Sequence, residues 1–165
     1  MCDWVCYLIF SLENNKKTYI GSSNNQPKRL NAHNNNDPKI KRVGAKRTRG
    51  QTWVPLIIIG GFHDKRACLS FEAGWKRLSK GRNNGRLYFI NEMTQTNLRY
   101  TRDTCYNRLL DLLYFVHNVT LLDTKFRLNH DMKHPLNQPE GLTIKIFFEK
   151  WMRDLPWPHF IDFLE

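Results

Sequence analysis

The first 21 residues constrain the fold more than any other part of the chain. An apolar, aromatic-rich run covers residues 4–10, a polar stretch covers 13–17, and strand-forming residues resume at 18–20 before Gly21. Aromatic and β-branched residues on both sides of a short polar segment are typical of two antiparallel strands joined by a turn. The sequence therefore predicts a β-hairpin at the N-terminus.

Three more elements are expected in the same half of the chain. Pro27 suits the first turn of a helix that ends before the Asn-rich stretch 34–38. The apolar run 53–59 predicts a buried strand because two glycines close it, and Asp64 is a suitable N-cap for a following helix. The order strand, strand, helix, strand, helix predicts an α+β fold, with an antiparallel sheet flanked by helices.

The Gly- and Asn-rich stretch 81–85 separates this unit from the rest of the chain. We predict one compact domain over residues 1–85 and a C-terminal extension over 86–165. In the extension, apolar residues at helical spacing predict a helix over 102–117, and alternating residues predict a half-buried strand over 142–148. An aromatic tail follows that strand.

Positive charge is concentrated in the first half of the chain. Residues 1–82 hold 16 of the 26 Lys and Arg residues but only 5 of the 15 acidic residues, so the whole formal excess of +11 falls there. A basic surface attracts phosphate backbones, and the aromatic and Asn residues between these cations suit nucleic acid better than solubility alone. We expect a nucleic acid to bind this half.

The cysteines and the N-terminus bear on the cellular compartment. The four cysteines are scattered and include no Cys-x-x-Cys pair, which argues against a disulfide framework and against a zinc ribbon or RING domain. The first ten residues carry an acid at position 3 and no basic segment, so we expect neither a signal peptide nor a membrane span. These features predict a soluble intracellular protein.

Five short motifs follow one another between residues 5 and 75. They are Val5-Cys6-Tyr7, Tyr19-Ile20-Gly21, Lys28-Arg29-Leu30 with His33-Asn34, Gly44-Ala45-Lys46-Arg47-Thr48, and Phe71-Glu72-Ala73-Gly74-Trp75. Their order and spacing resemble the GIY-YIG endonucleases, in particular the Slx-type structure-selective branch. Val-Cys stands in place of Gly-Ile in the first motif, but its tyrosine is retained. The resemblance implies a small GIY-YIG nuclease domain.

Cleavage of a phosphodiester needs a proton acceptor, a cation and donors that hold the phosphate. The basic half has only five acidic residues, widely spaced, which favours a site with one metal and one carboxylate. The resemblance implies Mg²⁺ or Mn²⁺ held by Glu72, with Tyr7 and Tyr19 near the attacking water and the scissile phosphate. Nothing in the composition alone assigns these roles.

The same resemblance implies supporting roles for two residues on the first helix. A tyrosine with an ordinary pKa near 10 is a poor base, so Arg29 would stabilise the phenolate and also hold a phosphate oxygen. His33, one turn later, would hydrogen-bond Tyr19 or the phosphate, unless it serves only to bond a neighbour on the helix face. Glu72 remains the single expected metal ligand.

Basic side chains of the first helix and the following loop are expected to contact the DNA backbone, each displacing a counterion. These residues are Lys28, Lys41, Arg42, Lys46, Arg47 and Arg49. Trp53 is expected in the core rather than as a base-stacking platform.

The resemblance to the Slx-type branch implies branched double-stranded DNA as substrate, such as flaps, replication forks or Holliday junctions. No RING domain is expected, because its Cys and His ligands are missing, so a homodimer, a scaffold subunit or no protein partner all remain open. The expected location is the nucleus or a site of DNA replication, including a viral one. Two other functions stay open: a non-catalytic DNA-binding module and a sequence-specific duplex endonuclease.

Overall fold

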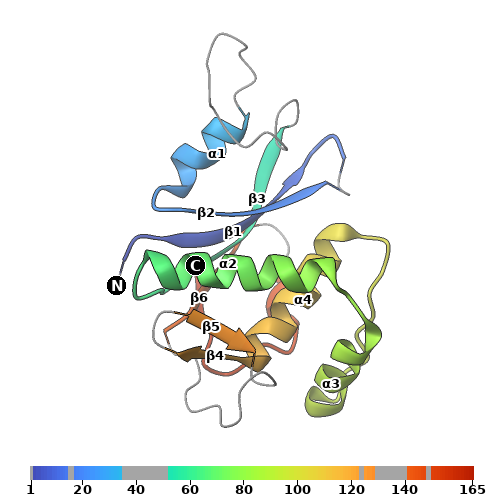
Figure 1. Ribbon diagram of the computed structural model, residues 1–165. Coiled ribbons are helices and arrows are strands. Elements are labelled where there is room, and N and C mark those ends of the chain that lie inside the picture. Colours follow the sequence, from blue (N-terminus) through green and yellow to red (C-terminus); the bar gives the residue numbers. More distant parts are fainter. Residues whose placement is uncertain (1, 15–16, 35–51, 123–124, 129–140, 148–149) are drawn as a thin grey trace.

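The computed structural model describes residues 2–14, 17–34, 52–122, 125–128, 141–147 and 150–165. The strands are β1 (Val5–Ser11), β2 (Thr18–Ser23), β3 (Trp53–Gly60), β4 (Val119–Leu122), β5 (Lys125–Leu128), β6 (Thr143–Ile146) and β7 (Asp162–Leu164). The helices are α1 (Gln26–Asn34), α2 (Lys65–Lys80), α3 (Asn84–Thr94), α4 (Thr104–Asn118) and the short 3-10 helix η3 (Lys150–Asp154). A five-stranded sheet in the order β2-β1-β3-β6-β7 forms the centre, and β4 and β5 form a separate ribbon (Figure 1).

The predicted N-terminal β-hairpin is present. β1 pairs antiparallel with β2, with Tyr7 opposite Gly21 and Ile9 opposite Tyr19. On its other side β1 pairs antiparallel with β3, with a register shift after Leu8. β1 therefore has a strand on each side and is covered on both faces, which is why its sequence is a continuous apolar run instead of an alternating one.

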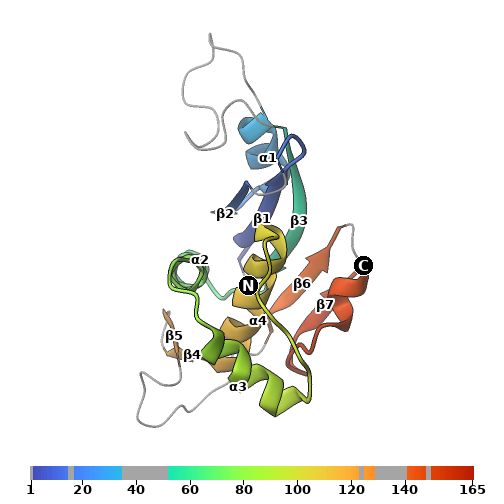
Figure 2. The same ribbon diagram turned by 90° about the vertical axis from the view of Figure 1, so that its right-hand side faces the viewer.

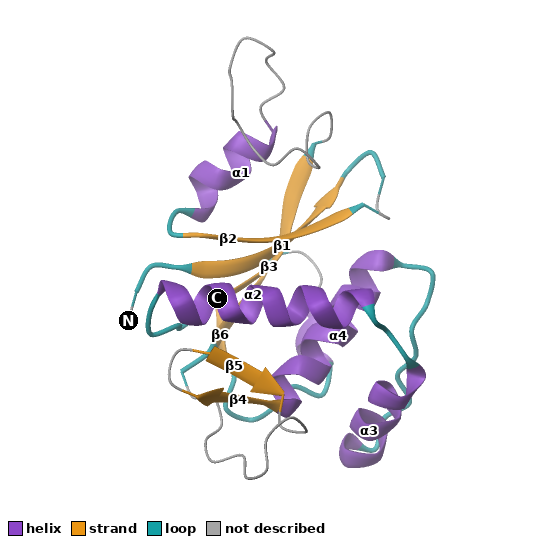
Figure 3. Ribbon diagram, in the orientation of Figure 1, coloured by secondary structure: helices purple, strands orange, loops and turns teal. Residues whose placement is uncertain are grey.

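Helices cover both faces of this sheet. Cys6 and Leu8 point to one face and Tyr7 and Ile9 to the other, as successive residues of a strand must, and none of the four is more than 1% exposed. The first pair belongs to the core cluster that includes α2 and α4, whereas the second packs with Leu30 of α1. Figure 3 shows α1 and α2 on opposite sides of the strands. The predicted α+β fold is confirmed.

α2 follows the pattern expected from its sequence. The Asp64 carboxylate accepts a hydrogen bond from the Ala67 N–H at 2.8 Å, which satisfies one free donor of the first turn. At Gly74 the helix passes close to α4, because an added Cβ would lie 2.5 Å from Cζ of Phe115. A larger residue at this position would push the two helices apart.

The core continues past residue 85. β6 pairs antiparallel with β3, and β7 pairs parallel with β6, so the C-terminal segment completes the sheet begun by the hairpin. Leu112 of α4 lies in the same buried cluster as Leu8 of β1. The helix expected over 102–117 corresponds to α4, and the strand expected over 142–148 corresponds to β6. One hydrophobic core therefore contains residues from both sides of the Gly- and Asn-rich stretch 81–85.

α3 is an element that the sequence analysis did not predict. Asn83 caps it by accepting a hydrogen bond from the Arg86 N–H at 3.2 Å. Leu87 and Ile90 pack α3 against Leu110 of α4, and Figure 2 shows α3 at the lower end of the molecule.

Among the helices of the described ranges, none is both long and apolar enough to span a bilayer.

Candidate active site

Three rings meet on the face of the sheet that α1 covers. Tyr7 and Tyr19 are diagonal neighbours on β1 and β2, and their ring centroids are 6.5 Å apart. Tyr7 Oη lies 2.9 Å from His33 Nε2, and the centroids of Tyr19 and His33 are 4.9 Å apart. Tyr7 and His33 are each 1% exposed, so the hydrogen bond between them is shielded from water.

Gly21 makes room for these two tyrosines. A Cβ at this position would lie 2.5 Å from Tyr7 Oη and 2.8 Å from Tyr19 Cε1. Any side chain here would displace both rings. The glycine of the second motif is therefore explained by close packing, since its place opposite Tyr7 lets the Tyr7 hydroxyl and the edge of the Tyr19 ring lie over bare backbone.

α2 brings a carboxylate and a lysine to the same place. Lys76 Nζ lies 3.2 Å from Glu72 Oε2 and 5.5 Å from the ring centroid of Tyr19. Glu72 remains 18% exposed, and its charge acts on the pKa of Tyr7. The sequence analysis did not single out Lys76, although its position four residues after Glu72 on one helix face is the pattern that could have indicated it.

The surroundings of Tyr7 hold it as a neutral phenol. Burial raises its pKa most, the neighbouring Tyr19 raises it further, and Arg29 lowers it through a hydrogen bond and through its charge. The charge of Glu72 also raises the pKa, and the net result lies well above the usual value of 10. Arg29 thus acts on Tyr7 in the expected direction, but burial outweighs it.

His33 hydrogen-bonds Tyr7. The expected partners were Tyr19, a phosphate or a neighbour on the helix face, and the hydroxyl that lies 2.9 Å from Nε2 is that of Tyr7 on β1. Burial, and then the charge of Arg29, lower the pKa of His33 to about 4. A neutral imidazole in the Nδ1-protonated tautomer accepts the Tyr7 proton at Nε2.

The low pKa of His33 predicts how the stability of the protein depends on pH. Between pH 6.5 and about 4 the unfolded chain binds a proton at this residue that the folded chain does not, so stability should fall as the pH is lowered through this range. NMR of the His33 ring should give a midpoint near 4, and His33→Gln should flatten this part of the curve of melting temperature against pH. A midpoint near 6.5 would contradict the buried, neutral state.

Asn34 connects this helix to β3. Its side-chain amide donates to the Trp53 carbonyl at 2.9 Å, and its side-chain oxygen accepts from the Trp53 N–H. The pair fixes the end of α1 where His33 is located. Trp53 itself is 2% exposed, which confirms its predicted place in the core.

The expected DNA contacts are only partly within the described residues. Lys28 is exposed on α1, next to Arg29. The other five lie outside the described ranges: Lys41, Arg42, Lys46, Arg47 and Arg49.

A metal at this site would depend on one carboxylate. The described part of the chain contains no group of three or more His, Cys, Asp or Glu residues that could hold a metal ion. Mg²⁺ in phosphoryl-transfer sites commonly binds one or two carboxylates and completes its shell with water and substrate phosphate. The partly exposed Glu72, whose charge acts on Tyr7 and whose partner Lys76 lies over the Tyr19 ring, fits such a site.

Comparison with known families decides what this arrangement belongs to. The model of the GIY-YIG catalytic domain matches residues 3–86, a range that includes Tyr7, Tyr19, Arg29, His33 and Glu72. The chain belongs to the GIY-YIG family. Its first half is therefore a GIY-YIG nuclease domain, as the motifs indicated.

Individual relatives agree with this GIY-YIG assignment. An uncharacterized protein of Acanthamoeba polyphaga mimivirus is 58% identical over 98% of this chain and 96% of its own length. The structure-specific endonuclease subunit SLX1 of Vanderwaltozyma polyspora is 33% identical over 50% of this chain, and its homolog in Cryptosporidium parvum is 43% identical over 43%. The matches cover only 30% and 17% of those two proteins.

Proposed function

We propose that this GIY-YIG protein is a divalent-metal-dependent endonuclease that nicks branched double-stranded DNA. The observation that carries the proposal is the buried Tyr7–His33 hydrogen bond beside the carboxylate of Glu72. A proton acceptor, a relay and a metal ligand then lie on three different elements that meet at one place.

Tyr7 and His33 would together take the proton of the attacking water. Tyr7 alone has no phenolate available to accept a proton at working pH, because burial raises its pKa and keeps it a neutral phenol. His33 is neutral at working pH, and in its Nδ1-protonated tautomer it would accept at Nε2, so the Tyr7 hydroxyl would pass its proton to His33 as it receives one from water. Tyr19, with its ring beside both, would orient the water.

Glu72 is the proposed ligand of Mg²⁺ or Mn²⁺. A cation bound there would stabilise the charge that develops on the phosphate and lower the pKa of the attacking water. Lys76 pairs with the same carboxylate and holds it in place at 3.2 Å. The Glu72 side chain would thus be oriented before metal and DNA arrive.

Cations around the rings would hold the phosphate. Arg29 lowers the pKa of Tyr7 and carries a planar guanidinium suited to two phosphate oxygens. Lys28, exposed beside it, would contact the adjoining backbone. The basic residues of the segment 39–49 would extend this contact.

Preference for branched DNA is supported by the relatives named as structure-specific endonuclease subunits. Flaps, replication forks and Holliday junctions, the intermediates of repair and recombination, are the proposed substrates. One such site makes one nick, so resolving a four-way junction would need a homodimer, a scaffold that holds two copies, or two successive encounters. The mimivirus relative supports a site of viral DNA replication as the place of action.

A cleavage assay tests this function directly. Purified protein is incubated with labelled 5′-flap, four-way junction and plain duplex DNA in Mg²⁺, Mn²⁺ or EDTA. We expect nicking of the branched substrates in both metals, little of the duplex, and none in EDTA. Binding without any cleavage would favour a non-catalytic DNA-binding module, and nicking of duplex at defined sequences would favour a sequence-specific endonuclease.

A further inference from the structure

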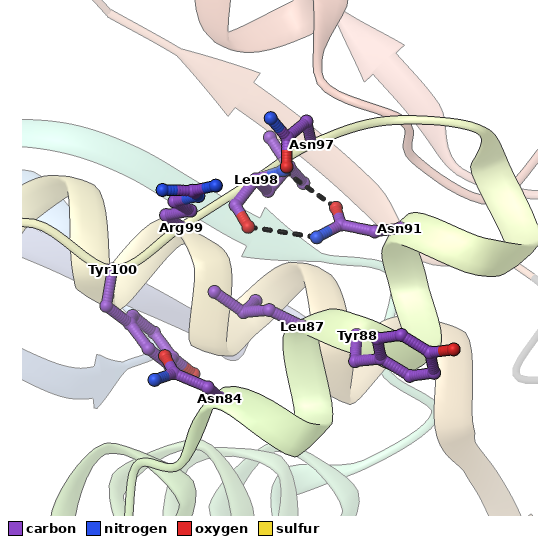
Figure 4. Close-up of a pocket in the computed structure, with 8 residues that line it drawn as sticks. All are labelled: Asn84, Leu87, Tyr88, Asn91, Asn97, Leu98, Arg99 and Tyr100. Carbon is purple, nitrogen blue, oxygen red and sulfur yellow. Dashed lines mark hydrogen bonds between the residues drawn. The ribbon is translucent and has the colours of Figure 1, made fainter.

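A pocket lies between α3 and the segment that follows it, and we call it the α3 pocket (Figure 4). Its volume is about 370 Å³, within the usual range for a small-molecule site. Side chains that line it include Asn84, Leu87, Tyr88, Asn97, Arg99 and Tyr100. One wall is fixed by Asn91, whose side chain both donates to the Leu98 carbonyl at 2.9 Å and accepts from the Leu98 N–H at 2.7 Å.

The lining combines three kinds of chemistry. Leu87 is buried and gives an apolar floor, while Asn84 and Asn97 are exposed amides that offer both donors and acceptors. Tyr88 is 66% exposed and presents an aromatic ring to solvent. Arg99 adds an exposed cation. Amides read base edges, aromatic rings stack on base faces and guanidinium groups bind phosphate, so the set matches a nucleotide.

The pocket is anchored to the end of α2. The Tyr100 hydroxyl donates to the carboxylate of Asp111 at 2.7 Å, and the Arg82 guanidinium lies 5.7 Å from the centroid of the Tyr100 ring. Arg82 also bonds Asp111, at 2.8 Å. The Tyr100 ring is thus held in place before any ligand binds, which lowers the cost of binding.

A row of side chains on α2 runs from Glu72 toward the end of the helix that precedes α3. Glu72, Lys76 and Lys80 recur at four-residue spacing, so they share one face of the helix and span about 12 Å. Lys80 is exposed at the end of α2, and α3 begins at Asn84. Figure 1 shows α3 following the end of α2. A DNA strand bound by Lys76 and Lys80 would run from the scissile phosphate toward the pocket.

We infer that the α3 pocket binds unpaired nucleotides of the DNA substrate, with a base stacked on Tyr88 and a phosphate of the same strand on Arg99, on the other side of the pocket. Unpaired nucleotides expose their faces and edges, whereas paired ones do not. The contact would therefore favour a flap or a fork over plain duplex. The inference rests on the proposed endonuclease function and adds a second DNA site to it.

Binding of a hexathymidylate labelled with fluorescein tests the pocket without cleavage. Fluorescence anisotropy is measured for the wild type, Tyr88→Ala and Arg99→Ala, and for the matched controls Phe89→Ala and Arg102→Ala. Phe89 is also an exposed aromatic residue of α3 and Arg102 is also an exposed arginine, but neither lines the pocket. We expect each pocket variant to weaken binding about tenfold and each control less than about twofold.

A cleavage assay distinguishes a defect in the pocket from a defect in the active site. A flap has unpaired nucleotides and a fully paired four-way junction has none, so the pocket variants should slow nicking of the flap by about tenfold and leave the junction unchanged. Equal losses in pocket and control variants, or no loss in any, would overturn the inference. If the wild type nicks no DNA while hexathymidylate binding depends on Tyr88 and Arg99, the endonuclease proposal fails and the pocket stands.

Discussion

Glu72→Gln should lower the rate of DNA nicking by roughly 10²- to 10³-fold or more, because the amide keeps the shape of the side chain but loses the charge that would hold a metal. Glu72 is 18% exposed and its pair with Lys76 is near the surface, so stability should change by less than about 1 kcal/mol. DNA affinity should stay equal or rise, since one negative charge is removed from a site that binds phosphate.

The matched control for this variant is Glu92→Gln. Glu92 is an exposed carboxylate on α3 and lies in a different element from the ring cluster. Single-turnover nicking of a 5′-flap in Mg²⁺, with circular dichroism of both variants, gives the comparison. If Glu72→Gln cuts at the wild-type rate, the metal is held elsewhere and the proposed role of this carboxylate is wrong.

Asp111→Ala should destabilise the protein by about 3–5 kcal/mol, because it removes one partner of a buried charge pair. The Asp111 carboxylate is 1% exposed and accepts hydrogen bonds from Ser79 Oγ and Arg82 Nε at 2.8 Å and from Tyr100 Oη at 2.7 Å. The substitution leaves these three donors without their acceptor. Urea unfolding followed by tryptophan fluorescence measures the loss.

Two further variants serve as controls for the loss of stability in Asp111→Ala. Asp111→Asn keeps an acceptor of the same shape and should cost less than the alanine, because it still bonds Tyr100. Asp154→Ala removes an exposed carboxylate from η3 and should change stability by less than about 0.5 kcal/mol. Equal, small effects of Asp111→Ala and Asp154→Ala would show that the buried network contributes little to stability.

The hairpin, the helix after Asp64 and the central strand beginning at Trp53 could be predicted from sequence, because periodicity, capping and turn residues agree locally. α3 could not. Glycine and asparagine at 81–85 indicate a break, and only the structure shows Asn83 serving as a cap. β7 is equally hidden, since it is three residues long and pairs in parallel with β6.

The candidate site, too, could be predicted only in part from the sequence. The motifs picked out Tyr7, Arg29 and Glu72, but the pattern of letters says nothing about burial. Burial raises the pKa of Tyr7 and lowers that of His33, and both follow from packing of α1 against the sheet, which arises only in the folded chain. Which tyrosine hydroxyl lies at His33 Nε2 could not be predicted from the motifs either, because it depends on the register of the hairpin.

The double hydrogen bond between Asn34 and Trp53 has a consequence for how such proteins diversify. It joins the two ends of the segment 35–51 at one point of the scaffold. Insertions, deletions or exchanges between these ends would leave the position of His33 unchanged, since the entropy cost of closing a chain segment at a fixed point rises only slowly with its length. Evolution or an engineer could therefore replace this basic segment, which we propose contacts DNA, while the placement of Tyr7 and His33 is inherited intact.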